Sequence, residues 1–452
     1  MGHASPGSPA LIWDTMSRFQ IAIVALCICI AGLDGFDVLV VAFTAPEIAK
    51  EWALSPAALG GLFSAGLAGM GFGALLIAPL GDKWGRRPTI LLCLAILVIG
   101  MFAAAYARSL SELAAVRFFT GLGIGAILAN VNIVVAEYAS NRRRDLCVAL
   151  MSVGYPIGAT LGGVAAVYLI HAWGWRSVYL FGGFVALLLI PATLLYLPES
   201  LAFLVARRPA GALDAINRVL ARMERPALSA LPPAPSTVEA RRQQSVLTIF
   251  RTPFLASTLA TSFLYFSVMA TCYFLLSWTP KLLTDLGFST SVGISGSLLI
   301  NIGGVVGCIL FGLYANRLGV RRLAVAFMLG LSVMTMIFGL LPAETLILLV
   351  AALALGFFLH TSITVLYVVV PTIFPAAVRA TGTGFSMSIG RVGAVMGPLV
   401  AGWLMAAGFQ RPVYFAVLAI PMLIAIACLF SLRALDVREP VLEDGQPVPG
   451  AA

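Results

Sequence analysis

Apolar runs of about 20 residues recur along almost the whole chain, and they constrain its fold more than any other feature. A helix of that length crosses the hydrocarbon core of a bilayer. Only 10% of the residues are charged, against about 25% in soluble domains. The sequence therefore predicts an all-α membrane protein with twelve transmembrane helices. We place the spans at about 19–45, 57–80, 88–107, 111–136, 146–170, 177–198, 254–279, 291–315, 323–342, 345–370, 380–406 and 412–433.

The spans fall into two groups of six, separated by one long polar segment. We expect two pseudo-symmetric halves, 19–198 and 251–433, joined by a central loop at 199–250 that is rich in Arg and Pro. A short lead, 1–18, precedes the first half, and a polar tail, 434–452, follows the second. Parallel repeats of six spans are typical of one large class of secondary transporters.

The basic residues predict the orientation of the chain. Of its 28 Lys and Arg residues, 21 fall in the loops and ends on one side of the predicted spans, and five fall on the other side. Cytoplasmic loops carry the excess of positive charge in membrane proteins. Both termini and the central loop are therefore expected in the cytoplasm. The net charge of +9 is explained in this way and does not indicate nucleic-acid binding.

Two carboxylates interrupt the first span. Asp34 and Asp37 lie three residues apart in an apolar run, so they share one helical face. Each costs roughly 2.5 to 3.5 kcal/mol at the centre of a membrane helix, and such residues often mark an ion or proton path. They predict a proton-coupled transporter; the alternative is that the pair caps or salt-bridges a neighbouring helix.

Two arginines also lie within spans. Arg117 is about two turns into the fourth span and matches Asp37 in depth, so an ion pair is expected, either taking part in proton coupling or static. Arg391 lies about 18 Å deep in the eleventh span. Near the midplane, its planar guanidinium could hold a carboxylate through two hydrogen bonds. The alternative for Arg391 is a partner within the helix bundle.

Aromatic and polar side chains in the spans are candidates for the wall of a substrate pocket. Each could instead serve helix packing or a bond between helices. The candidates are Phe36, Asn130, Tyr155, Phe266, Tyr273, Asn301 and His360.

The two halves repeat a pattern of charged residues at the cytoplasmic ends of their spans. Asp82–Arg87 follows the second span, and Asn316–Arg321 follows the eighth. These residues could latch the halves together when the cytoplasmic side is closed, or simply anchor the loops as basic residues. The gating candidates are Asp82, Arg86, Arg87, Glu137, Arg144, Asn316, Arg317, Arg321 and Arg379.

Three motifs resemble those of the major facilitator superfamily. Leu80-Gly-Asp-Lys-Trp-Gly-Arg-Arg-Pro88 is similar to its signature loop between helices 2 and 3, and Arg117-Phe-Phe-Thr-Gly-Leu-Gly-Ile-Gly125 to its helix 4 motif. Pro198-Glu-Ser200, after the sixth span, also resembles the pattern of that superfamily. Ala78 and Asn316 depart from the pattern, which indicates a weaker second gate.

Asp34-Gly-Phe-Asp37 resembles the helix 1 signature of the aromatic acid:proton symporters within that superfamily. The resemblance implies import of a benzoate or hydroxybenzoate across the bacterial inner membrane, driven by the proton gradient without a cofactor, by a monomer. Nicotinate import and proton-antiport export of small molecules remain alternatives, and so does a transporter-like sensor. No catalytic or metal-binding constellation indicates an enzyme.

Overall fold

A computed structural model describes residues 15–231, 246–252, 254–374 and 378–433, and the structured elements in these ranges are helices. The long helices of the first half are α1 (Arg18–Trp52), α2 (Pro56–Leu76), α4 (Arg86–Ala105), α5 (Leu110–Tyr138), α6 (Arg144–Trp173) and α7 (Arg176–Tyr196). Those of the second half are α11 (Leu255–Asp285), α12 (Thr290–Leu318), α13 (Val320–Leu340), α14 (Thr345–Ile373), α15 (Arg379–Ala406) and α16 (Arg411–Arg433).

Short elements connect the long helices. They are α3 (Leu80–Lys83), the 3-10 turns η2 (Asn141–Arg143) and η3 (Val246–Phe250), and α8 (Leu201–Arg207) and α9 (Ala212–Arg222) in the central loop. Eleven helices among the described residues are long and apolar enough to cross a membrane. The twelfth predicted span corresponds to α16, of which Arg411–Ala427 is a shorter apolar helix.

Several helices extend beyond the apolar runs that predicted them. α1 begins at Arg18, where the Ser17 side chain accepts a hydrogen bond from the Gln20 N–H and the Gln20 side chain accepts one from the Ser17 N–H. This reciprocal cap satisfies two backbone donors that the first helical turn leaves free. The helix then continues past the predicted end at residue 45, through Pro46, to Trp52.

Glycines bring pairs of helices into backbone contact in the same way in both halves. A Cβ atom on Gly158 of α6 would lie 1.9 Å from the Gly32 carbonyl oxygen of α1, and one on Gly397 of α15 would lie 2.1 Å from the Ala270 oxygen of α11. The pairs α2–α5 and α12–α14 repeat this pattern. Small residues at such crossings allow close van der Waals packing between membrane helices.

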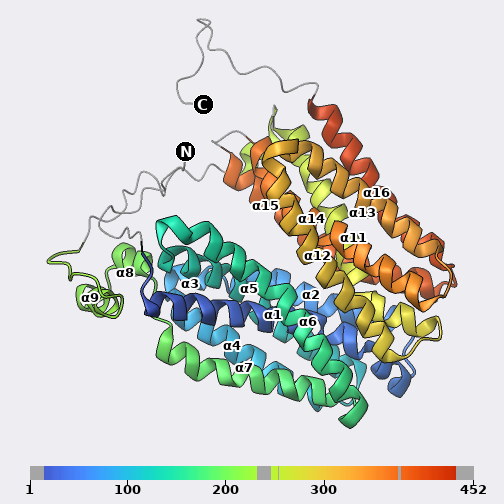
Figure 1. Ribbon diagram of the computed structural model, residues 1–452, viewed down its shortest axis with the longest axis horizontal. Coiled ribbons are helices and arrows are strands. Elements are labelled where there is room, and N and C mark those ends of the chain that lie inside the picture. The colour runs from blue at the N-terminus through green and yellow to red at the C-terminus, as the bar shows by residue number, and fades with distance from the viewer. Residues whose placement is uncertain (1–14, 232–245, 253, 375–377, 434–452) are drawn as a thin grey trace, which may run out of the picture.

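The two halves meet at one end of the bundle, which we call the narrow end. There the Ser64 hydroxyl donates to the Val395 carbonyl oxygen at 2.7 Å, and the Phe63 and Trp278 rings lie 5.2 Å apart. Thr290 Oγ1 also donates to Glu47 Oε1 at 2.6 Å across the same end. In Figure 1 the two groups of helices converge here and diverge toward the opposite end, where α3 and α8 lie.

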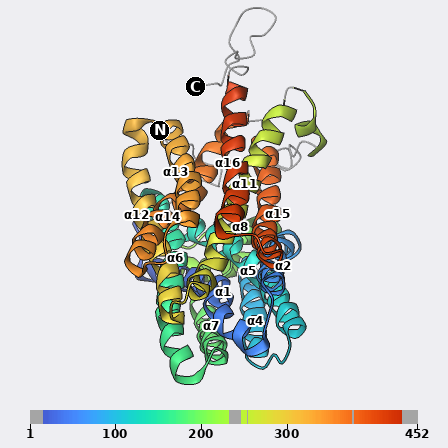
Figure 2. The same ribbon diagram turned by 90° about the vertical axis from the view of Figure 1, so that its right-hand side faces the viewer.

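The opposite, wide end carries the basic clusters at the starts of α4, α6 and α13. Figure 2 shows α4 and α7 on the outer side of the first half, away from the second half. The inner helices of the first half are therefore α1, α2, α5 and α6, and of these α1, α2 and α6 contact helices of the second half. Side chains between the two halves thus come mainly from these helices and from α11, α12 and α15.

Candidate functional site

Arg117 and Asp37 form a buried ion pair between α5 and α1. Arg117 Nη1 donates to Asp37 Oδ1 and Nη2 to Oδ2, both at 2.9 Å. Nη2 also donates to the Asp37 carbonyl oxygen at 2.9 Å. The two side chains are only 3% and 0% exposed. The predicted pairing is confirmed, and the fork geometry is the one in which Arg holds a carboxylate most strongly; a part in proton coupling remains a prediction.

Asp34 lies one turn before Asp37, but its environment differs from that of Asp37. It is 1% exposed, and neither of its carboxylate oxygens has a hydrogen-bond partner among the described residues. Gly35 beside it lets α6 approach, because a Cβ there would lie 2.1 Å from the Tyr155 carbonyl oxygen. An ionised carboxylate in this position would lack the partners that normally offset its loss of hydration.

Arg391 of α15 lies on the other side of the interface and interacts electrostatically with Asp34. Its side chain is half-buried. No described residue forms an ion pair or hydrogen bond with its guanidinium. The expected alternative, a partner within the bundle, is thus not found in the described part of the chain.

Tyrosines from both halves surround this pair of charges. Tyr155 of α6, Tyr273 of α11 and Tyr367 of α14 are all within electrostatic range of the Arg391 guanidinium. Tyr155 and Tyr273 are half-buried, and Tyr367 is 46% exposed. The structure therefore brings Asp34, Arg391 and two of the predicted aromatic residues together between the halves.

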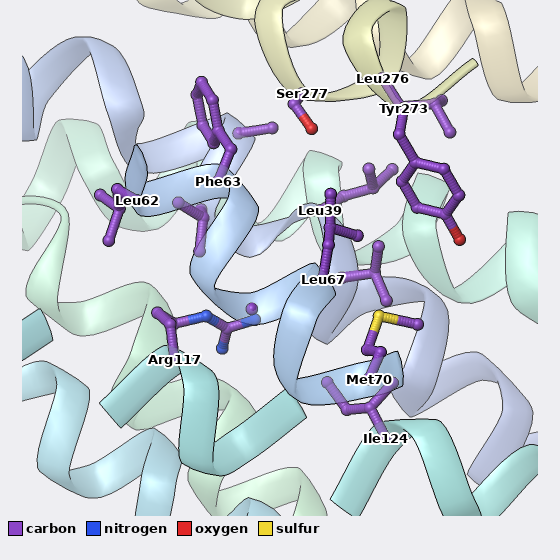
Figure 3. A pocket seen from close by; sticks show the side chains of 14 residues that line it. Leu39, Leu62, Phe63, Leu67, Met70, Arg117, Ile124, Tyr273, Leu276 and Ser277 are labelled. Carbon is purple, nitrogen blue, oxygen red and sulfur yellow. The ribbon is translucent and has the colours of Figure 1, made fainter. Parts of the chain in front are cut away.

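A small cavity lies next to this group, toward the narrow end. It is bounded by α1, α2, α5 and α11, and Figure 3 shows Arg117 reaching it from α5 and Tyr273 from α11. Apart from Arg117, Tyr273 and Ser277, its lining is apolar. Its volume of about 20 Å³ has room for about one water molecule. The packed narrow end thus closes the site on this side.

Some predicted pocket residues lie elsewhere. The Phe36 ring packs against Phe181 at 6.0 Å and lies over Gly162 and Gly182, among α1, α6 and α7. The helical period turns Phe36 about 100° from Asp37, so it faces the interior of the first half. Asn130 lies in the wide-end network described below. Both residues belong, in this structure, to the packing of one half.

The remaining predicted pocket residues lie in the second half. Phe266 of α11 is half-buried, and its carbonyl group contacts Gly393 of α15. Asn301 of α12 is fully buried, and the His360 ring of α14 lies on Gly304 of α12.

At the wide end, Glu199 joins the end of the first half to the start of α4. Its Oε1 accepts hydrogen bonds from the backbone N–H groups of Arg86 at 2.7 Å and of Arg87 at 3.3 Å. A carboxylate at a helix N-terminus is stabilised by unpaired N–H groups and by the helix dipole. Gly85 makes room for it, because its φ of +109° suits glycine and a Cβ would lie 2.2 Å from Glu199 Oε2.

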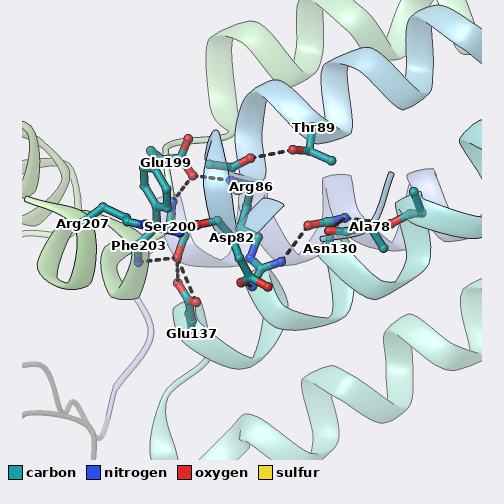
Figure 4. Close-up of polar contacts among 12 residues, drawn as sticks. Ala78, Asp82, Arg86, Thr89, Asn130, Glu137, Glu199, Ser200, Phe203 and Arg207 are labelled. Atoms are coloured by element: carbon teal, nitrogen blue, oxygen red, sulfur yellow. Dashed lines mark hydrogen bonds and ion pairs between the residues drawn. The ribbon is translucent and has the colours of Figure 1, made fainter. Parts of the chain in front are cut away.

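Arg86 extends this network along the wide end. Its guanidinium pairs with Asp82 and donates from Nη1 to Asn130 Oδ1 at 2.9 Å. Glu137 accepts from the Ser200 hydroxyl at 2.7 and 2.9 Å. Figure 4 shows these groups side by side. The contacts fix α3, α4, α5 and α8 relative to one another within the first half.

The other gating candidates form no ion pair between the halves in the part of the chain that is described. Arg144 and Arg317 are exposed, and Arg379 Nε donates to the nearby Phe374 carbonyl oxygen at 3.3 Å. The side chains of Asn316 and Arg321 lie outside the described residues. A latch across the wide end thus stays a prediction.

Sequence reasoning missed two residues of these groups as site candidates. Glu199 and Ser200 were apparent only as part of a motif. The only sequence signal for Glu199 was an acidic residue directly after a span.

Comparison with known proteins agrees with this architecture. The family model described as Major Facilitator Superfamily matches residues 25–344 and 302–450. A gallate transporter from Pseudomonas putida is 34% identical over 419 residues, 92% of each chain. The 4-hydroxybenzoate transporter PcaK of Pseudomonas aeruginosa is 32% identical over 421 residues, again 92% of each chain.

Among solved structures, an inward-open form of the xylose transporter XylE from E. coli has a TM-score of 0.71 at 15% identity. It covers 91% of this chain and 96% of that one. These relatives and neighbours are transporters and not enzymes. With a matching family model over most of its length, this chain belongs to the major facilitator superfamily of multi-pass membrane transporters.

Proposed function

We propose that the protein imports a small aromatic carboxylate together with a proton across the bacterial inner membrane. The observation that carries the proposal is the pair of charged groups between the halves, Arg391 and Asp34, neither of which has a hydrogen-bond or ion-pair partner among the described residues. Two relatives whose names specify gallate and 4-hydroxybenzoate support the substrate class. The protein is proposed to act as a monomer with twelve spans and without a cofactor.

The carboxylate of the substrate binds Arg391. The guanidinium presents a planar set of donors that matches a carboxylate, and no described residue occupies it. The aromatic ring then lies between Tyr155 and Tyr273, whose rings offer the flat apolar surface that such a ligand needs. Because these two tyrosines come from different halves, substrate binding favours closure of the halves around it.

Asp34 carries the coupling proton. Its carboxyl group has no hydrogen-bond partner among the described residues, so the neutral form avoids the cost of a buried unpaired charge. Asp37, in contrast, is held by Arg117 through two side-chain bonds. One proton per carboxylate follows from this difference, and the transport cycle is then electroneutral.

The basic wide end faces the cytoplasm in this proposal, in line with the excess of Lys and Arg there. The structure then represents a state open to the inside and closed to the outside. Return to the outward-open state requires separation of the narrow-end contacts, including those of Ser64 and Glu47.

Uptake of radiolabelled 4-hydroxybenzoate into proteoliposomes tests the proposal. An inward proton gradient is expected to drive accumulation, and a protonophore to abolish it. A membrane potential alone should drive none if one proton accompanies each anion, whereas a second proton would add about 2.3 kcal/mol per 100 mV. Nicotinate and gentisate are tested as competitors.

Variants connect the assay to the site. Asp34→Asn is expected to abolish uphill uptake while retaining exchange of labelled for unlabelled substrate. Arg391→Lys keeps the charge but loses the planar fork, so its KM should rise more than its kcat falls. Gradient-driven efflux instead of uptake would favour the exporter alternative, and full accumulation by Asp34→Asn would refute the assigned role of Asp34.

A further inference from the structure

A second group of polar atoms without partners among the described residues lies in the second half, on α12 and α14. Asn301 is fully buried; its Nδ2 donates to the Ser297 carbonyl oxygen at 2.9 Å, while its Oδ1 has no partner among the described residues. The Ser297 hydroxyl and His360 Nε2 are likewise buried without a described partner. Buried polar atoms are almost always paired, so three such atoms together need an explanation.

These three groups lie close to one another. Ser297 and Asn301 are one turn apart on α12 and share a face. The His360 ring of α14 lies over Gly304, three residues after Asn301, where an added Cβ would be 2.3 Å from its Cδ2 atom. Gly304 therefore gives the imidazole its place beside the Asn301 face of α12.

Tyr367 of α14 relates the position of this group to that of the proposed carboxylate site at Arg391. Tyr367 follows His360 by seven residues on α14, which places it two turns away on the same face, roughly 10 Å along the helix. Tyr367 in turn is within electrostatic range of Arg391. In the proposed binding pose, an aromatic acid held at Arg391 extends along α14, and the far edge of its ring is directed toward His360 and Asn301.

The chemistry of the group matches a phenolic hydroxyl. A hydroxyl is one donor and also an acceptor. Asn301 Oδ1 can only accept, the Ser297 hydroxyl can donate or accept, and His360 Nε2 does either according to its tautomer. A ring hydroxyl could donate to Asn301 and accept from Ser297 or His360. A bare ring edge would leave these atoms unpaired.

We propose that Ser297, Asn301 and His360 form a hydroxyl-binding subsite that makes the transporter selective for ring-hydroxylated aromatic acids over unsubstituted benzoate. The inference rests on the proposed function, because it assumes the carboxylate at Arg391. A site built to bond a hydroxyl discriminates strongly against an analogue that lacks it, since its own polar atoms then stay buried and unpaired. Discrimination of at least about tenfold in Kd is expected, the equivalent of about 1.4 kcal/mol.

Direct binding to the purified full-length protein tests the subsite separately from transport. Isothermal titration gives Kd values for benzoate, 4-hydroxybenzoate and 3,4,5-trihydroxybenzoate. The wild-type protein is expected to bind at least one hydroxylated acid about tenfold or more tightly than benzoate. This ratio needs no variant, so it can be measured even if substitutions impair folding.

Variants then assign the discrimination to residues. Asn301→Leu and His360→Phe are each expected to weaken binding of the hydroxylated acid about tenfold and to leave benzoate within about twofold. Thr335→Val on α13 removes a buried hydroxyl whose only partner among the described residues is the Leu331 carbonyl of its own helix; it is the matched control and should change neither Kd.

The outcomes separate the two proposals. Equal affinity of the wild-type protein for benzoate and the hydroxylated acids, with proton-driven uptake of both, would overturn the subsite and leave the proposed function intact. An equal loss for all ligands in Asn301→Leu and His360→Phe would show a structural role and also overturn it. Binding of none of these acids would overturn both proposals.

Discussion

The ion pair of Arg117 and Asp37 allows a quantitative test of how charge is stabilised inside this protein. Asp37→Leu removes two of the three hydrogen bonds that the guanidinium makes to Asp37, and leaves the one to its carbonyl oxygen. Arg117 is only 3% exposed, so its charge would remain buried with little compensation. Breaking a buried pair in this way costs about 3 to 5 kcal/mol.

Removing both charges should lower the stability of the protein much less than removing one of them. In Asp37→Leu combined with Arg117→Met, apolar side chains of similar size replace the pair, and such replacements are often neutral or stabilising. The double-mutant cycle should therefore give a coupling energy of several kcal/mol. At about 2 °C per kcal/mol for a long chain, each single substitution should lower Tm by roughly 6 to 10 °C.

The assay is thermal unfolding of the purified variants in one detergent at one pH. Asp37→Glu and Arg117→Lys keep the charges and are expected to fall between the wild type and the apolar single variants. If both apolar single variants kept the wild-type Tm, or if their effects simply added in the double variant, the buried-charge argument would be wrong. Uptake by the double variant then distinguishes a static pair, which transport does not need, from one that takes part in the cycle.

Three further predictions concern contacts away from this pair. Gly158→Ala should strongly lower Tm, because its Cβ would lie 1.9 Å from the Gly32 oxygen, whereas Gly71→Ala, with open space around it, should not. Glu199→Ala removes a helix cap and should lower the free energy of unfolding by about 1 to 2 kcal/mol, measured as a lower Tm. Glu199→Gln should lower it less, since an acceptor oxygen remains. Glu47→Ala removes the hydrogen bond from Thr290 and should favour narrow-end opening. To measure this, Leu62→Cys is introduced into a cysteine-free background with and without Glu47→Ala. Faster alkylation of that cysteine in the Glu47→Ala variant would show the opening; an unchanged rate would mean that the bond does not limit opening.

The sequence allowed prediction of the features that depend on composition and on how deep a residue lies within its predicted span. The apolar runs located the long helices, and the equal depths of Arg117 and Asp37 in their spans predicted the ion pair. Each of these inferences needs only the length of a helix and the thickness of a membrane.

Rotation about a helix axis and distant contacts could not be predicted in this way. Phe36 is adjacent to Asp37 in sequence, yet it faces α7, because the packing of α1 on α6 at Gly32 and Gly35 decides which side points to the interface. Glu199 bonds a helix start more than a hundred residues away. Such contacts depend on how six helices pack together, which no local pattern records.

Arg391 and Asp34, which have no hydrogen-bond or ion-pair partner among the described residues, suggest why the proposed site would couple substrate to proton. In the empty deprotonated state, Arg391 and Asp34 can offset each other's charge across the interface. In the fully loaded state, the substrate carboxylate neutralises Arg391 and the proton neutralises Asp34. With only one of the two ligands bound, a single uncompensated charge would be enclosed when the halves close, at a cost of several kcal/mol. Since every 1.4 kcal/mol is a factor of ten, closure of the half-loaded forms would be at least about a hundredfold rarer, and leak would be suppressed without any separate gate for the proton.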